Sequence, residues 1–387
     1  MHLRKKKCIF WSSRQNLTKW MKKIHILKKK NIWKKLGLDQ LIIPLTALAL
    51  LLLFNLIRDP SFYAIGITYN NSGNPVLSGN IISIIDSASE LAIIAIGMTM
   101  VTAATGGQDI SVGAVGAISA TVFVTVLRAF SDITIPTVLL GIVCSIVVTV
   151  LFMCFNGTLV AVFKIQPMIA TLILFSCGRS IAYWIVGSAT PQVNSPIITA
   201  MGMTIPGIPI PTPVFGVILV GLVLAIAFRF SSIRLYTQSV GINQGAARLN
   251  GINPTAVKLL SFVILGVCVA VAAVIATARM GQVSHKAILI DIEMDAILAV
   301  AIGGNSLGGG RFKISGSILG AYIIQMLTTT LYAMSVPPVN VKVYKALVII
   351  VIVAAGSPVI KNKLTALRNR TRSRGEQSAE EKKGAKV

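Results

Sequence analysis

Charged residues are scarce in this sequence. Asp and Glu number only 12 among 387 residues, and charged side chains of both signs make up 12% of the chain, against 54% for hydrophobic residues. A water-soluble domain carries about a quarter charged residues. A soluble core large enough to hide this much apolar surface is implausible, so lipid is the expected solvent and an integral membrane protein is the expected class.

Residues that support catalysis or metal binding are also few. The three histidines, His2, His25 and His285, are scattered, and the five cysteines have no metal-binding or redox spacing. The Gly-rich segment 303–313 lacks the Gly-Lys-Ser/Thr ending of a phosphate-binding loop. We therefore expect a chain that is not an enzyme, holds no metal or cofactor, and depends on an outside energy source if it moves a solute uphill.

Basic residues are plentiful, but they gather at the two ends. Residues 1–40 hold 13 Lys/Arg and one acid, and residues 361–387 hold nine Lys/Arg and three acids. Basic ends flanking an apolar body are typical of segments retained in the cytoplasm. No nucleic-acid-binding module accompanies the charge, so we expect no nucleic-acid partner. The long basic start without a small-residue cleavage site argues against a signal peptide.

Ten apolar runs approach the length of about 20 residues that crosses a bilayer. They cover residues 41–57, 81–104, 110–130, 137–156, 167–187, 213–230, 258–278, 292–303, 314–335 and 342–358. The eighth run is short and Gly-rich sequence follows it, which predicts a broken helix covered by protein or facing a cavity. An even number of crossings leaves both ends on one side, and 29 of the 36 Lys/Arg then fall in cytoplasmic segments.

The expected fold is an all-α membrane protein of about ten transmembrane helices, multi-pass in the cell membrane, with both termini cytoplasmic. Its expected parts are a basic tail at 1–40, a transmembrane domain at 41–358 and a second basic tail at 359–387. Three outer loops, 58–80, 188–212 and 279–291, are long or rich in turn-forming residues. They are either exposed connectors or surfaces for a soluble partner.

The longest inner loop, 229–258, carries a helix signal. Good helix formers occupy 244–249, Gly241 and Gly251 flank them, and Pro254 starts the next element. This pattern predicts a short helix lying on the cytoplasmic surface. Such a helix suits insertion into a groove of a partner, although a plain linker is the alternative.

Two groups of carboxylates are candidates for a role in the membrane. Asp86 and Glu90 lie four residues apart near the outer end of the second run. Asp109 lies in TGGQDIS, between the end of one helix and the start of another. A carboxylate there is favourable with the next helix dipole, so Asp109 either stabilises that helix start or takes part in gating.

Arg179 is a cation well inside a predicted span. Intramembrane charges are costly and face a partner or a cavity. Arg179 is therefore interpreted either as a structural residue that joins helices through an ion pair or as part of a solute path. The acids Asp291, Glu293 and Asp295 cluster before the eighth run.

Four blocks carry a resemblance to a known family. They are IGMTMVTAATGGQDISVGAVGAISA at 96–120, IQPMIATLILFSCGRSIAY at 165–183, GINQGAARLNGI at 241–252 and EMDAILAVAIGGNSLGGGRFKISGSILGA at 293–321. In this order and spacing, over roughly residues 40–358, they resemble sugar-importer permeases of the ABC superfamily, the ribose/xylose/galactose branch. Within the branch, FKIQPMIATLIL, VNSPIIT and GGRFKISGSILGAYIIQ look like galactofuranose importer permeases. Gln108 departs from the apolar residue usual in the GGxD pattern.

The resemblance implies partners. Two permeases, either identical or different, would form the path across the membrane; a separate ABC ATPase would bind ATP and magnesium on the inside; and an extracytoplasmic sugar-binding protein would deliver the solute. By match, the coupling helix that contacts the ATPase would be formed or framed by Gly241, Asn243, Ala246, Ala247, Arg248 and Gly251.

A neutral sugar needs hydroxyl and amide contacts along its path rather than fixed charge. The candidates for the path or its gating are Gly106, Gly107, Asp109, Ser111, Arg179, Glu293, Asp295 and Asn305. Two competing hypotheses remain. An ion-gradient-driven secondary transporter would use Asp86, Glu90 or Asp109 as its coupling carboxylate. A non-transporting membrane scaffold or sensor would need no ATPase partner.

Overall fold

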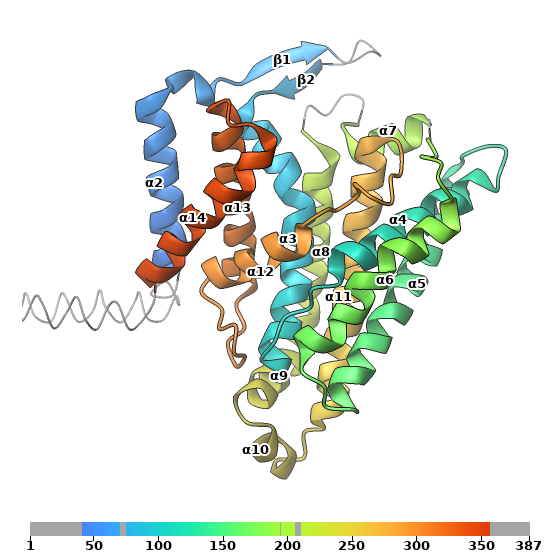
Figure 1. The fold of residues 1–387 in the computed structure, drawn as a ribbon, viewed down its shortest axis with the longest axis vertical. Helices are drawn as coiled ribbons and strands as arrows, with labels where there is room; N and C mark the ends of the chain where they lie inside the picture. Colours follow the sequence, from blue (N-terminus) through green and yellow to red (C-terminus); the bar gives the residue numbers. More distant parts are fainter. Residues whose placement is uncertain (1–40, 70–74, 194, 206–209, 357–387) are drawn as a thin grey trace, which may run out of the picture.

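The computed structural model describes residues 41–69, 75–193, 195–205 and 210–356, and it is built almost wholly of helices (Figure 1). The predicted basic tails lie outside the described residues. The elements in chain order are α2 (Ile42–Arg58), η2 (Pro60–Tyr63), β1 (Gly66–Tyr69), β2 (Pro75–Ser78), α3 (Asn80–Thr105), α4 (Val112–Arg128), α5 (Ile135–Ala161), α6 (Pro167–Val186), α7 (Pro196–Gly202), α8 (Thr212–Phe230), α9 (Ile233–Ile242), α10 (Gln244–Leu249), α11 (Pro254–Met280), α12 (Ile292–Ile302), α13 (Ile314–Ala333) and α14 (Pro338–Gly356).

Each of the ten predicted apolar runs coincides with a helix. Among the described residues, six helices are long and apolar enough to cross a membrane: α3, α5, α6, α8, α11 and α13. Helices α2 and α4 are apolar but shorter. The protein is therefore a multi-pass helical membrane protein, while the number of ten crossings stays a prediction.

The predicted break in the eighth run is present. Helix α12 ends at Ile302 after 11 residues, and α13 begins only at Ile314. The segment between them contains three glycines with positive φ, at Gly304, Gly309 and Gly310. These left-handed conformations suit residues without a Cβ and keep the two helices separate.

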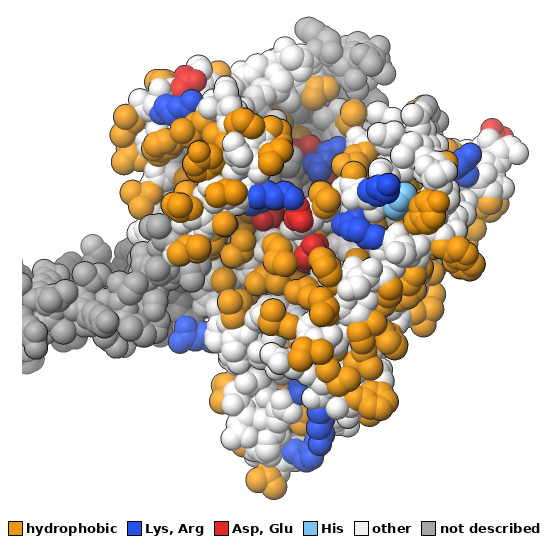
Figure 2. Space-filling view, in the orientation of Figure 1, with side chains coloured by type: hydrophobic (Ala, Val, Ile, Leu, Met, Phe, Trp, Pro, Cys, Tyr) orange, Lys and Arg blue, Asp and Glu red, His pale blue; other side chains and the backbone are white. Residues whose placement is uncertain are grey.

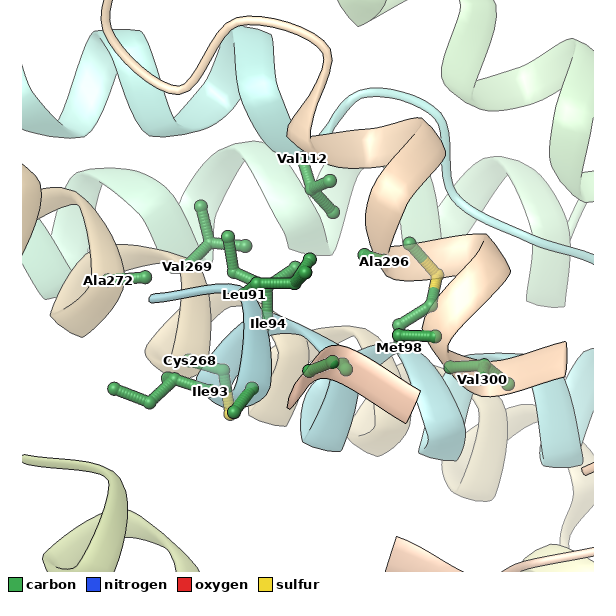
Figure 3. Close-up of a cluster of buried hydrophobic side chains, with 14 of the residues drawn as sticks. Leu91, Ile93, Ile94, Met98, Val112, Cys268, Val269, Ala272, Ala296 and Val300 are labelled. Atoms are coloured by element: carbon green, nitrogen blue, oxygen red, sulfur yellow. The ribbon is translucent and has the colours of Figure 1, made fainter. Parts of the chain in front are cut away.

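Helices α3 and α11 form the centre of the molecule. In each of them 67% of the most apolar window is buried, against 17% in α8, so α8 presents most of its surface outward. Figure 3 shows the core around them. Its labelled residues come from α3 (Leu91, Ile93, Ile94 and Met98), α4 (Val112), α11 (Cys268, Val269 and Ala272) and α12 (Ala296 and Val300).

The two ends of the bundle carry different elements. At one end the antiparallel hairpin β1–β2 and the short helix α7 lie within the predicted outer loops (Figure 1). At the opposite end α9 and α10 project from the bundle. The predicted helix at 244–249 is confirmed as α10. The sequence did not predict β1, β2, α7 or α9, because four-residue strands and helices of seven to ten residues carry too little periodicity.

Candidate functional site

The projecting end is shaped by two asparagine caps. Asn243 has an extended backbone that breaks the chain between α9 and α10, and its Oδ1 accepts the backbone N–H of Ala246 at 3.0 Å. Asn253 caps α11 by accepting the N–H of Thr255 at 3.0 Å. Asn side chains satisfy the unpaired N–H groups at helix starts. These caps allow α9, α10 and α11 to change direction within a few residues.

The tip of this projection has an unpartnered surface. Leu249 is 91% exposed and Ile242 is 75% exposed, whereas Ala247 is buried. Arg248 is exposed beside Leu249, and Gly251 has the left-handed φ of +78° just after α10. Large apolar side chains standing free beside a cation are typical of an interaction surface. The residues predicted to form the coupling helix therefore lie together on one protruding element.

A glycine junction, formed by Gly106, Gly241, Gly309 and Gly310 around the carbonyl of Ala103, connects this element to the bundle. The N–H of Gly310 donates to the Ala103 oxygen at 3.0 Å. A Cβ on Gly241 would lie 1.8 Å from that oxygen, and one on Gly309 would lie 3.0 Å from the Cα of Gly106. Backbones approach this closely only where side chains are missing. The backbone at the end of α9 thus packs directly against the backbones of α3 and the 303–313 segment.

Side-chain hydrogen bonds extend the same connection. Gln108 Nε2 donates to the carbonyl of Leu307 at 2.8 Å. Asn305 accepts the N–H of Lys313 at 2.7 Å and donates to Ser317 Oγ at 2.8 Å. The predicted path candidate Asn305 therefore closes the segment between α12 and α13. Gln108, which departs from the family pattern, fastens that segment to the loop after α3.

The loop after α3 ends in a buried polar group. Asp109 Oδ1 accepts the backbone N–H and the hydroxyl of Ser111 at 2.6 and 2.7 Å, and Asn156 Nδ2 donates to Ser111 Oγ at 2.9 Å. Complete burial raises the pKa of Asp109 to about 6, although these hydrogen bonds act in the opposite direction. Gly107 lies against Pro167. Asp109 thus holds Ser111, the residue that precedes α4, while its two interpretations, stabilising the start of that helix or gating, both stay predictions.

Arg179 forms its hydrogen bonds with backbone carbonyls. Its guanidinium donates to the carbonyl oxygens of His285, Ile288 and Leu289 at 2.9, 3.1 and 3.3 Å, and to that of Lys286 at 3.4 Å. Among the described residues no carboxylate oxygen lies within 4.0 Å of the guanidinium, but Glu293 and Asp291 are near enough to act on it electrostatically, so the ion-pair interpretation stays a prediction. The five N–H donors of Arg suit a turn whose carbonyls converge. Arg179 thereby attaches α6 to the loop before α12.

The acids of α12 pair mostly with α14. Lys345 Nζ lies 2.7 Å from Asp295 Oδ1, and Lys342 pairs with Asp291. Glu293 is buried, and its Oε2 has no hydrogen-bond partner among the described residues. Figure 2 shows acidic and basic side chains gathered across the middle of this face between apolar surfaces.

A second ion-pair group lies between α3 and α11, and the sequence did not predict it. Arg279 Nη2 lies 2.6 Å from Glu90 Oε2, and Arg279 Nη1 lies 3.5 Å from Asp86 Oδ2. The spacing of the two acids on α3 was the available signal, but nothing local to the sequence identified Arg279 as their partner.

The predicted path candidates therefore do not form one site. Gly106, Gly107, Asp109, Ser111 and Asn305 belong to the loops that meet near the projecting end. Arg179, Glu293 and Asp295 belong to the charged region around α12. The two regions approach each other at the start of α4, where Gly113 lies against the Glu293 carboxylate.

Comparison with known proteins agrees with this architecture. Residues 80–355 match the family described as "Branched-chain amino acid transport system / permease component". The galactofuranose transporter permease protein of Escherichia coli K12 is 35% identical over 87% of this chain and 94% of its own length. The fructose import permease protein of Bifidobacterium longum NCC 2705 is 34% identical over 89% of this chain and 94% of its own length.

A ribose import permease protein from Bacillus subtilis 168 is 29% identical over 86% of this chain and 94% of its own length. No solved structure gives a significant match. The family match covers more than half of the chain, and two relatives exceed 30% identity over nearly their whole length. The chain belongs to the ABC-type permease family that contains these sugar import permeases.

Proposed function

We propose that this chain is the membrane-spanning permease subunit of an ATP-driven importer of a monosaccharide. Its relatives are named as permeases for galactofuranose, fructose and ribose, which are uncharged polyhydroxy compounds. Galactofuranose is the proposed first candidate because of the motifs shared with that permease. The chain itself holds no cofactor; ATP and magnesium are bound by a partner ATPase, and a sugar-binding protein delivers the solute from outside.

The single observation that carries the proposal is the projecting pair α9–α10. Its tip exposes Leu249, Ile242 and Arg248, and its base is fitted into the glycine junction. A partner that binds the tip and moves would also move α9, because the end of α9 packs tightly against Ala103 and Gly310. Motion of the tip therefore reaches α3 and the 303–313 segment. We place this end in the cytoplasm, with both termini on the same side.

The permease is proposed to act as a dimer, with a second copy or a different permease of the same family. The test is co-purification. A tagged full-length chain, expressed in its native host and extracted in mild detergent, is expected to retain an ATPase and a second permease in stoichiometric amounts. ATP hydrolysis by that complex is expected to rise on addition of the loaded sugar-binding protein. A chain that purifies alone, with no associated ATPase, would support the scaffold hypothesis instead.

A further inference from the structure

Arg279, in the last turn of α11, lies on the boundary between two cavities. The first, of about 450 Å³, is lined by residues of the β1–β2 hairpin, the start of α3 including Asp86, and Arg279. The second, of about 240 Å³, is lined by residues of α3, α11, α12 and α13, among them Glu90, Gln325 and again Arg279. The first cavity lies at the hairpin end, and the second lies beside the loop before α12, whose residues Ala287, Leu289 and Ile290 also line it.

The two acids that pair with Arg279 line different cavities. Asp86 and Glu90 lie one turn apart on α3, so they share a face of the helix. Asp86 lines the hairpin-end cavity and Glu90 lines the second one. Arg279 contacts both carboxylates, at 3.5 and 2.6 Å, and a quarter of its side-chain surface is exposed. The Arg279 guanidinium therefore lines both cavities and separates one from the other.

The second cavity, called here the Gln325 cavity, has the chemistry of a site for a neutral polyhydroxy ligand. Its polar lining consists of Ser87, Glu90, Arg279, Asp295 and Gln325, and the rest is apolar. Glu90 is paired with Arg279, and Asp295 is paired with a lysine of α14. Because Arg279 is shared by Asp86 and Glu90, these two acids, Arg279, Asp295 and its lysine together carry one more negative than positive charge. This excess disfavours an anionic ligand and leaves a neutral polyhydroxy solute acceptable.

Hydrogen-bonding capacity is left over in this lining. Glu90 Oε1 has no hydrogen-bond partner among the described residues, and only 6% of the Glu90 side chain is exposed. A sugar hydroxyl both donates and accepts, so it suits a carboxylate acceptor, a guanidinium donor and an amide that does both. A buried acceptor without a partner costs free energy that a bound hydroxyl would recover.

We propose that the Gln325 cavity holds the monosaccharide in transit, with Glu90 and Gln325 binding its hydroxyls and Arg279 separating it from the hairpin-end cavity. This inference rests on the proposed function. The sugar enters the hairpin-end cavity and then passes Arg279. During this passage the Arg279 guanidinium keeps its ion pair with Asp86, Glu90 or both, so no unpaired charge is left behind.

The test uses the assembled transporter in proteoliposomes, with ATP supplied to the ATPase side and saturating binding protein on the other. Radiolabelled D-galactose, D-fructose and D-ribose are the probes, and the readout is sugar transported per ATP hydrolysed. Gln325→Leu keeps the side-chain volume but removes both hydrogen-bonding groups. Glu90→Gln removes the charge and also weakens the Arg279 pair. Thr328→Val is the matched control on α13, because within the described part of the chain the Thr328 hydroxyl bonds only the carbonyl of Ile324 in its own helix.

The expected result is a fall of about tenfold in sugar per ATP for Gln325→Leu and Glu90→Gln, with ATP hydrolysis retained and Thr328→Val unchanged, as loss of one ligand hydrogen bond predicts. General damage would lower hydrolysis and transport together. If the wild-type complex transports a probe and both variants keep its sugar-to-ATP ratio, the cavity assignment is overturned while the proposed function stands. If the wild type transports none of the three sugars, the proposed function fails and the inference fails with it.

Discussion

Gly241 at the end of α9 lies so close to Ala103 near the end of α3 that a Cβ atom on Gly241 would stand 1.8 Å from the Ala103 carbonyl oxygen. That oxygen already accepts the N–H of Gly310 at 3.0 Å. Three segments far apart in sequence therefore share one peptide group. The contact joins the element that we assign to ATPase docking with the central helix of the bundle.

Gly241→Ala is expected to destabilise the protein, because backbone cannot yield to the added methyl group as a flexible side chain would. Overpacking of this kind costs about 1–3 kcal/mol. Gly221→Ala on α8 is the matched control, because nothing lies within 4 Å of its added Cβ. There, Ala should be neutral or stabilising by roughly 0.5–1 kcal/mol. Thermal unfolding in detergent checks both, and equal midpoints for the two variants would contradict the junction.

Arg248→Glu is expected to weaken docking of the ATPase without affecting folding. Arg248 is exposed on the projecting tip next to Leu249, so reversing its charge changes the surface rather than the packing. Arg128→Glu, a charge reversal at the exposed end of α4, serves as the control. At least about a fivefold loss of co-purified ATPase is expected for Arg248→Glu alone, a typical effect for an interface charge. Equal amounts of co-purified ATPase from both variants would show that Arg248 is not part of the interface.

The buried Asp109 should make stability depend on pH. Burial raises the pKa of Asp109 from 3.8 to about 6. The folded state therefore holds a proton that the unfolded state releases between about pH 4 and pH 6, and stability falls as pH rises through that window. Asp109→Asn removes the titration but keeps a side-chain acceptor for the Ser111 N–H.

Thermal midpoints of wild type and Asp109→Asn, measured from about pH 4 to pH 7, should diverge up to about pH 6, with the wild type losing stability relative to the variant, and run parallel above it. Asp109→Ala, which loses the acceptor, should be less stable than Asp109→Asn at every pH. Parallel pH curves for wild type and Asp109→Asn over the whole range would show that Asp109 does not titrate as a buried group.

Arg179 should hold the loop before α12 in place. Its guanidinium binds carbonyls of residues 285–289, and Lys286 in that loop is exposed. Arg179→Gln removes most of these donors and should speed tryptic cleavage after Lys286 at least about threefold, because local opening governs such cleavage. Mass spectrometry of a digestion time course measures it, with Arg128→Gln as the control. An unchanged cleavage rate would mean that other contacts fix the loop.

Much of the helical framework could be predicted from the sequence because it depends on local pattern. Apolar runs located the long helices, the glycines after Ile302 located the break, and helix formers located α10. Pairings between distant residues could not be predicted in the same way. Glu90 and Arg279 are 189 residues apart, and their contact depends on how α3 packs against α11.

Arg179 illustrates a second reason why contacts between distant residues could not be predicted from the sequence. Its position inside an apolar run indicated that a partner was needed, and an acid was the natural candidate. The partners are backbone carbonyls, which every residue has, so no residue type marks them in a sequence. The same holds for the glycine junction, where the contacts are between backbones and the sequence shows only that side chains are missing.

We propose above that this chain carries a sugar through the membrane with energy from a partner ATPase. The most direct measurement is uptake of radiolabelled D-galactose, D-fructose or D-ribose by proteoliposomes containing the assembled complex and its binding protein, with and without ATP, and with ionophores that collapse proton and sodium gradients. For an ATP-driven importer, uptake of at least one sugar is expected to require ATP and to survive the ionophores. Uptake that needs no ATP and disappears with the gradients would contradict it and identify a secondary transporter.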